Sequence, residues 1–215
     1  MWLRLIGIKR KPMFLNKADI EKLLKEGELI IKPLLDTSQV GEISIDFRLG
    51  YDFLVSIQGR EPFIDASLNN EDRHPISSFF QETRRNIGET FLLHPNQTVL
   101  TSSLEFIKMP RDVFAVLNMR SSYVRLGITI ATIIQPGYCG CMSLELTNTN
   151  KNAVNMTVGA PIIQARLYRL SSKSNYFSKP RKYICQVRPQ ISAVNDDGDL
   201  KILHRIWEES NNKIT

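Results

Sequence analysis

The segment MRSSYVRLGITIATIIQPGYCGCMSLELTN, residues 119–148, gathers residue types that could do chemistry. Two arginines and two serines stand near its start: Arg120, Ser121, Ser122 and Arg125. Guanidinium groups and hydroxyls are good donors to phosphate oxygens. No further charge follows until Glu145, a carboxylate that could accept a proton and return it. The segment therefore combines a cationic, anion-binding cluster with one candidate general acid and base.

Glu145 stands between Leu144 and Leu146 in an apolar, strand-like run. We expect these neighbours to withdraw it partly from water. Burial raises the pKa of a carboxyl group toward the range in which such a group shuttles protons. The competing interpretation is that an acid in an alternating strand simply points outward to solvent, just as an isolated Arg-Ser-Ser would be a solvated turn.

The elements that must position these residues are mainly β. From about residue 88 onward, short β-prone runs are separated by turn pairs such as HPNQ, MPRD and TVGAP, which favours an antiparallel sandwich or barrel. A strand is expected at residues 43–49, with Asp46 and Arg48 on one face and Gly50 interrupting the alternation. We interpret Asp46 and Arg48 as structural, an ion pair at the subunit contact. We interpret residues 57–90 as a polar insertion over this core, with a short helix in PISSFFQETRR.

Two further helices are expected. LNKADIEKLLKEGEL begins with Asn16 as the N-cap and ends at Gly27. Near the C-terminus an amphipathic stretch could dock on the core or on a partner subunit; it is formed by Leu200, Leu203, Ile206 and Trp207. No repeat or low-complexity linker divides the chain, so one domain is the simplest account.

The composition narrows the class of protein. The chain has 215 residues, 42% of them hydrophobic, and no apolar run long enough to cross a membrane. The N-terminus lacks the order of a signal peptide and three cysteines make no disulfide framework, so we expect a cytoplasmic protein. The net charge of +6 suits phosphorylated partners. The basic residues form no stripe with aromatic residues, which argues against nucleic acid.

Three motifs in order carry a resemblance to a known family. SIDFRLG, RSSYVRLG and PGYCGCMSLELTN resemble the trimeric dCTP deaminase branch of the dUTPase-like superfamily, from about residue 13 to about residue 190. The resemblance implies a mainly β subunit, a distorted β-barrel or jelly-roll-like dUTPase-like fold with a few short helices, assembled as a homotrimer. Each active site would be built from two chains and closed by a C-terminal lid at residues 172–190. Residues 1–12 would be an extension and residues 191–215 a tail.

The resemblance also implies a reaction and a role for each site residue. dCTP and water would give dUTP and ammonia, with Glu145 as the proton shuttle. Ser121, Arg125 and the backbone carbonyl of Ala131 would hold the attacking water. The residues that would bind the substrate are Arg120, Ser122, Gln135, Tyr138, Ser143, Leu144, Tyr176, Lys182 and Gln186. Magnesium would arrive with the triphosphate. The resemblance also implies a reaction without zinc, in agreement with the absence from the sequence of the H-x-E and P-C-x-x-C signature of zinc deaminases.

Two departures from the family pattern keep alternatives open. Gln135 stands where the family has an Asp that binds the sugar 3′-hydroxyl, and the stretch between RLG and QPG is a few residues shorter than usual. A Gln can still bind a hydroxyl but brings no negative charge. Tyr138, expected against the deoxyribose, could instead be a core residue. The alternatives are a dUTP diphosphatase, a bifunctional enzyme that forms dUMP, and a non-catalytic nucleotide-binding regulator; dTTP is a candidate inhibitor.

Overall fold

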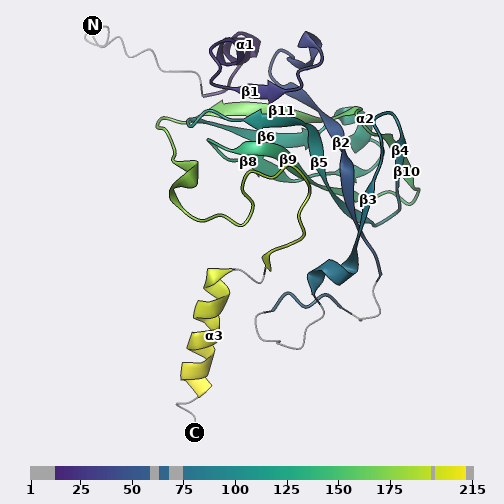
Figure 1. The fold of residues 1–215 in the computed structure, drawn as a ribbon, viewed down its shortest axis with the longest axis vertical. Coiled ribbons are helices and arrows are strands. Elements are labelled where there is room, and N and C mark those ends of the chain that lie inside the picture. Colours follow the sequence, from purple (N-terminus) through teal and green to yellow (C-terminus); the bar gives the residue numbers. More distant parts are fainter. Residues whose placement is uncertain (1–12, 59–62, 68–74, 195–196, 212–215) are drawn as a thin grey trace, which may run out of the picture.

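The computed structural model describes residues 13–58, 63–67, 75–194 and 197–211 (Figure 1). The expected extension at residues 1–12 and parts of the expected insertion lie outside these ranges. The strands are β1 (Ile30–Lys32), β2 (Ile45–Ser56), β3 (Phe80–Arg84), β4 (Thr90–Leu93), β5 (Thr98–Lys108), β6 (Val113–Met119), β7 (Ile128–Thr129), β8 (Thr132–Ile134), β9 (Cys139–Asn148), β10 (Val154–Thr157) and β11 (Pro161–Arg169). The helices are α1 (Lys17–Lys25), α2 (Ser121–Val124) and α3 (Gly198–Asn211), with 3-10 turns η1 (Thr37–Gln39), η2 (Ile76–Phe79) and η3 (Tyr176–Ser178).

The larger sheet curls until its two ends approach each other. Within the described ranges its strands follow the order β7-β9-β5-β2-β11-β6-β8, with β1 beside β5 and β3 beside β2. The end strands β7 and β8 are consecutive in the chain and are separated only by residues 130 and 131. Such a connection spans at most about 11 Å, so the sheet must bend round on itself. This curl produces the mainly β, barrel-like fold with few short helices that the resemblance implied.

The hydrophobic core follows from alternation along the strands. In β9, Met142, Leu144 and Leu146 are completely buried, whereas the residues between them face the other side of the sheet. β6 shows the same alternation of buried and more exposed positions. Burying a leucine side chain stabilises the fold by about 1.5–3 kcal/mol, so these strands are held mainly by their inward faces.

Helix α1 begins and ends where the sequence predicts. Asn16 forms a capping box: its side chain accepts a hydrogen bond from Asp19 N, and Asp19 accepts one from Asn16 N. Gly27 adopts φ +69°, the left-handed conformation that favours glycine after a helix. Ile20 and Leu23 are buried and attach α1 to the core.

Gly50 interrupts the alternation of β2, as predicted, without ending the strand. Leu49 and Gly50 are both buried, and the pairing of β2 with β5 shifts register between Leu49 and Phe53. The bare backbone of Gly50 lies against Ser102, whose carbonyl oxygen would be 2.5 Å from a Cβ at residue 50, so the glycine permits close packing of β2 on β5. The expected helix at residues 75–85 is instead the turn η2 followed by β3. β3 pairs with residues 52–56 of β2. This pairing satisfies backbone groups along that edge of β2, which a local helix would have left without partners.

After β11, the described part of the chain forms the turn η3 and no further strand before it enters α3. This helix confirms the predicted amphipathic stretch, but it extends away from the sheet in Figure 1 and buries none of its residues. Its apolar side chains are exposed: Ile202, Leu203, Ile206 and Trp207. The described chain therefore does not show the tail docked on the core. Among the described helices, none has the length and apolar character needed to cross a membrane.

Candidate active site

A pocket of about 660 Å³ brings together most of the residues expected to bind substrate. One part of its lining comes from β8, β9, the turn between them and Leu100 of β5, and the other part comes from the segment at residues 176–192. The expected residues that line it are Gln135, Tyr138, Ser143, Glu145, Tyr176, Lys182 and Gln186. The C-terminal segment therefore lies over the strand face that carries Glu145.

The prediction that Glu145 is buried is wrong for the single chain. Leu144 and Leu146 are completely buried, and strand alternation places Glu145 on the opposite, exposed face of β9. Apolar neighbours in the sequence do not withdraw a strand residue from water, because adjacent side chains point to opposite faces. For the same reason the side chain of Leu144 packs in the core and is not part of the pocket lining.

Two hydroxyl groups fix the carboxylate of Glu145. Thr132 Oγ1 donates a 2.6 Å hydrogen bond to Glu145 Oε2, and Ser143 Oγ donates a 3.1 Å hydrogen bond to Oε1. An ionised carboxylate has about four acceptor sites, so each oxygen can still accept a second donor. The carboxylate is thus oriented from both sides while remaining open toward the pocket.

Tyr138 and Tyr176 connect the pocket to the core. Their rings meet edge to face with centroids 5.9 Å apart, and both side chains are buried. The Tyr138 hydroxyl donates a hydrogen bond to the carbonyl of Cys141, and burial raises the pKa of Tyr138 far above its ordinary value. Tyr138 is therefore a neutral core residue, as the alternative interpretation predicted, and it also lines the pocket.

The C-terminal segment carries two cations into the pocket lining. The guanidinium of Arg181 lies over the Tyr176 ring, 4.3 Å from its centroid, and Arg181 Nε donates to the Tyr176 carbonyl at 2.8 Å. Lys182 Nζ lies 2.7 Å from Asp197 Oδ1. The buried Gln186 donates a 2.7 Å hydrogen bond from Nε2 to Gln190 Oε1. These polar groups are engaged within the chain, so contact with an anionic ligand would replace existing interactions.

Ser121 and Arg125 line a different pocket, of about 450 Å³. Ser121 begins α2 and Arg125 is its C-terminal cap, directly after β6. The polar residues that share this pocket are Asn118, Thr129, Gln164 and Arg166. A single chain therefore separates the expected water-binding residues from Glu145.

The linings of the two pockets approach each other around Ala131. Ile130 lines the pocket of Ser121, and Thr132 lines the pocket of Glu145. Ala131, whose carbonyl was expected to hold water, is exposed between them and lines neither pocket. The connection between the two ends of the sheet is thus also the connection between the two candidate half-sites.

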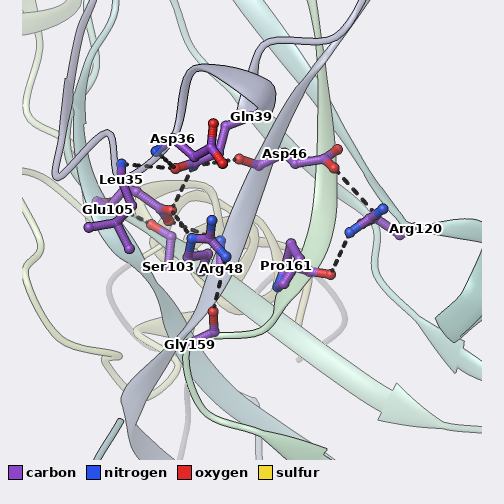
Figure 2. Close-up of polar contacts among 10 residues, drawn as sticks. All are labelled: Leu35, Asp36, Gln39, Asp46, Arg48, Ser103, Glu105, Arg120, Gly159 and Pro161. Carbon is purple, nitrogen blue, oxygen red and sulfur yellow. Dashed lines mark hydrogen bonds and ion pairs between the residues drawn. The ribbon is translucent and has the colours of Figure 1, made fainter. Parts of the chain in front are cut away.

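Arg120 and Ser122 also line neither of these two pockets. Figure 2 shows Arg120 turned toward Asp46, with Nε 3.4 Å from Asp46 Oδ2, and Arg120 Nη1 donates to the Pro161 carbonyl at 3.4 Å. Within the single chain, Asp46 and Arg48 therefore do not pair with each other. The two residues lie on one face of β2, but Arg48 pairs with Glu105 instead.

Figure 2 also shows a second cluster of polar contacts, formed by Gln39, Arg48 and Glu105. Glu105 is completely buried in this cluster. It accepts hydrogen bonds from Gln39 Nε2 at 3.1 Å and from Arg48 N at 3.0 Å, and Arg48 Nε lies 3.8 Å from Oε1. Burial outweighs these contacts and raises the pKa of Glu105. The cluster joins β2, β5 and η1, and it fixes the strand from which Asp46 reaches Arg120.

Sequence reasoning missed several residues that line the two pockets. Thr132 contacts Glu145 only because the sheet curls, and no local pattern could show this. Gln164 and Arg166 alternate with buried residues of β11, so their outward direction was available from the period of two. The alternation could not predict which residues of other elements Gln164 and Arg166 face.

Comparison with known proteins identifies the family. A family model described as dCTP deaminase-like matches residues 14–170. The chain belongs to this dCTP deaminase-like family. Its similarity to the crystal structure of 2′-deoxycytidine 5′-triphosphate deaminase from Agrobacterium tumefaciens has a TM-score of 0.56 at 23% identity, covering 74% of this chain and 49% of that chain. The dCTP deaminase fold therefore agrees with the family match.

Two curated relatives in the dCTP deaminase-like family differ in the product that their names give. The chain is 32% identical over 194 residues to a protein of Methanobrevibacter smithii named dCTP deaminase, dUMP-forming, covering 87% of this chain and 98% of that protein. It is 37% identical over 192 residues to the dCTP deaminase of Halorubrum lacusprofundi, covering 86% and 93%. Overall identity thus does not separate the two kinds of relative.

Proposed function

We propose that the chain catalyses the hydrolytic deamination of dCTP, releasing ammonia, in a homotrimer whose active sites lie between neighbouring chains. The observation that carries this proposal is Glu145, held by Thr132 and Ser143 in a pocket that the C-terminal segment covers. The names of the relatives supply the substrate. The separation of Ser121 and Arg125 from Glu145 supports a site that two chains complete.

Deamination at C4 of cytosine needs a base for the attacking water and an acid for the ring nitrogen and the departing ammonia. Glu145 would take the water proton and return it, since one oriented carboxylate can serve in both steps. Ser121 and Arg125 of a neighbouring chain would position the water and stabilise the charge that develops on it, with the Ala131 carbonyl as a further acceptor. Covering of Glu145 by a neighbouring chain would also supply the desolvation that the single chain lacks.

The remaining residues would hold the nucleotide. Ser143 and Gln135 would contact the base and the sugar, and Tyr138 would limit the space beside the deoxyribose. Arg120 and Ser122 would bind phosphate oxygens together with three residues of the C-terminal segment: Tyr176, Lys182 and Gln186. Phosphate binding by this segment would replace its internal contacts, such as Lys182 with Asp197, and so couple lid ordering to binding.

Magnesium is proposed to enter as part of the substrate complex. This ion commonly keeps several waters and is bound through substrate phosphates, so it needs few protein ligands. In the described residues there is no group of three or more His, Cys, Asp or Glu side chains placed to hold a metal ion. The residues that would hold the magnesium complex are therefore the phosphate-binding ones already named.

A second candidate is the bifunctional reaction that ends at dUMP. The observation that favours it is the relative named dCTP deaminase, dUMP-forming, of which the chain covers 98%. Gln135 weighs against it, because the amide brings no negative charge to activate a second water at the phosphates. Pyrophosphate is the product that separates this candidate from simple deamination.

The test measures ammonia and pyrophosphate released from dCTP, dUTP and CTP with magnesium, by wild type and by Glu145→Gln. Ammonia from dCTP that disappears in Glu145→Gln supports the proposal, and Glu82→Gln, an exposed carboxylate on β3, is the matched control. Pyrophosphate that accompanies the ammonia would assign the dUMP-forming reaction. Binding of dCTP without release of either product would refute both reactions and leave a nucleotide-binding regulator.

A further inference from the structure

Cys139 and Cys185 bring two thiols together beside the pocket. Their Sγ atoms lie 3.1 Å apart, although Cys139 begins β9 and Cys185 belongs to the C-terminal segment. Both are free cysteines; Cys139 is partly exposed and Cys185 is exposed. The sulfur atoms of a disulfide are about 2.05 Å apart, so a small movement would join them.

The backbone on both sides of Cys185 is held in place. The Tyr176 hydroxyl donates to the Tyr183 carbonyl at 3.1 Å, and Cys141 N donates to the Gln186 carbonyl at 2.7 Å. Cys185 itself has φ +50°, a conformation that L side chains seldom adopt. The two hydrogen bonds therefore fix the turn in which Cys185 faces Cys139.

Gly140 allows the C-terminal segment to lie directly on β9. It adopts φ +141°, and a Cβ at this position would be 2.5 Å from the Gln186 carbonyl oxygen and 2.9 Å from the Tyr138 hydroxyl. Only glycine fits this approach. The contact between Cys139 and Cys185 thus belongs to a built junction between the strand and the segment that covers Glu145.

We propose that Cys139 and Cys185 form a reversible disulfide, by exchange with a low-molecular-weight disulfide, that fixes the C-terminal segment over the pocket of Glu145. The exposed Cys185 thiolate attacks the small disulfide, forms a mixed disulfide and releases one thiolate. That thiolate takes the proton of Cys139, whose sulfur then attacks the Cys185 sulfur and releases the second thiolate. The two cysteines lose two electrons in total, and the small disulfide gains them.

The order of attack follows from the surroundings of the two thiols. Burial, followed by the contact with Cys185, raises the pKa of Cys139 to about 11. Cys185 is exposed whereas Cys139 is only partly exposed, so a small disulfide in solution reaches Cys185 first. Cys141 is less reactive, since burial raises its pKa. Its sulfur also has no thiol neighbour among the described contacts.

The consequence for turnover rests on the proposed function. Pocket residues Tyr183 and Gln186 flank Cys185, and Tyr138 directly precedes Cys139. A covalent bond between the two sulfur atoms would prevent the segment from lifting off the pocket. If nucleotides exchange by this opening, the oxidised protein turns over more slowly and recovers on reduction.

The test treats the full chain with oxidised glutathione and follows trypsin cleavage after Arg181 and Lys182, two exposed residues of the segment. Non-reduced peptide mass analysis identifies the bond. We expect a Cys139–Cys185 linked peptide and cleavage slowed about tenfold or more, since a disulfide that closes a loop disfavours the open state by at least this factor. Cys141→Ser should respond like wild type, whereas Cys139→Ser and Cys185→Ser should not, and a thiol reductant should restore cleavage.

Each other result overturns the inference. A linked peptide that contains Cys141, a bond between chains, glutathione adducts alone, or cleavage unchanged by oxidation would each refute the proposed disulfide. Proteolysis and mass analysis need no turnover, so a protein that forms this bond but releases no ammonia would refute only the proposed deamination. A deaminase whose rate is unaffected when the bond is complete would refute the block on nucleotide exchange.

Discussion

Thr132 donates its hydroxyl hydrogen to Glu145 across the seam of the curled sheet. Thr132 lies on β8, at one end of the strand order, and Glu145 lies on β9, next to the other end. The hydrogen bond of 2.6 Å is therefore made between strands that are far apart in the sheet but close in space. The orientation of the proposed proton shuttle depends on closure of the sheet.

Thr132→Val should lower kcat for dCTP by about tenfold or more. Hydrogen bonds to charged groups contribute roughly 1.5–3 kcal/mol, and each 1.4 kcal/mol of barrier is about tenfold in rate. KM should change little, because the hydroxyl orients Glu145 and does not hold the phosphates. Thr149→Val is the matched control, since the Thr149 hydroxyl donates to the Gly127 carbonyl at 2.9 Å and Thr149 lines neither pocket. Equal effects of the two variants would contradict the role of Thr132.

Mixed trimers should test whether two chains complete each site. Glu145→Gln and Ser121→Ala chains, each inactive alone, are refolded together in equal amounts. If one chain supplies Glu145 and its neighbour supplies Ser121, about a quarter of the sites contain both native residues, and activity returns in that proportion. A mixture of Glu145→Gln with the double variant is the control that cannot recover. Failure of the first mixture to regain activity would place both residues in one chain.

Gly140→Ala should loosen the C-terminal segment. The added methyl group would lie too close to the Gln186 carbonyl, so the segment must move away from β9. We expect faster trypsin cleavage after Arg181 and Lys182 and weaker binding of dCTP. Gly27→Ala is the matched control, because Gly27 also has positive φ but has no atom within 4 Å of the added methyl. Equal cleavage of both variants would show that backbone strain, and not displacement of the segment, is responsible.

The buried Glu105 should give stability a defined pH dependence. Its folded pKa is raised above the ordinary value of 4.5, so the folded chain holds a proton that the unfolded chain has lost. The resulting contribution is complete below about pH 4.5 and is lost as pH rises through the raised folded pKa. The free energy of unfolding of wild type minus that of Glu105→Gln, which does not titrate, should therefore fall with rising pH. Denaturant titrations at several pH values, with Glu82→Gln as control, measure it, and a flat or rising difference would contradict it.

The sequence predicted the residues of the candidate site better than their surroundings. Alternation and turn chemistry sufficed for α1, for the buried face of β9 and for the β class, because these depend on neighbours a few residues away. The motifs also pointed to seven of the sixteen residues that line the pocket around Glu145. Whether Glu145 is buried could not be predicted from Leu144 and Leu146. These neighbours point to one face of β9, and distant segments decide what covers the other face.

Two local preferences gave way for the same physical reason. The residues of β3 have local signals of a helix, but pairing with β2 decides their conformation. Asp46 and Arg48 could pair by spacing, yet within the single chain each finds a partner on another strand or turn. Long-range contacts thus overrode short-range preference at each of these positions.

The two-residue connection between β7 and β8 limits the circumference of the curled sheet. Residues 130 and 131 tie the edge that carries the Ser121 pocket to the edge that faces Glu145. The resemblance implies a stretch a few residues shorter than usual at this place. Such a shortening would not trim a surface loop but would draw the two edges together. Changes in its length would therefore resize both pockets at once, so the chain cannot alter one half-site through this connection and leave the other unaltered.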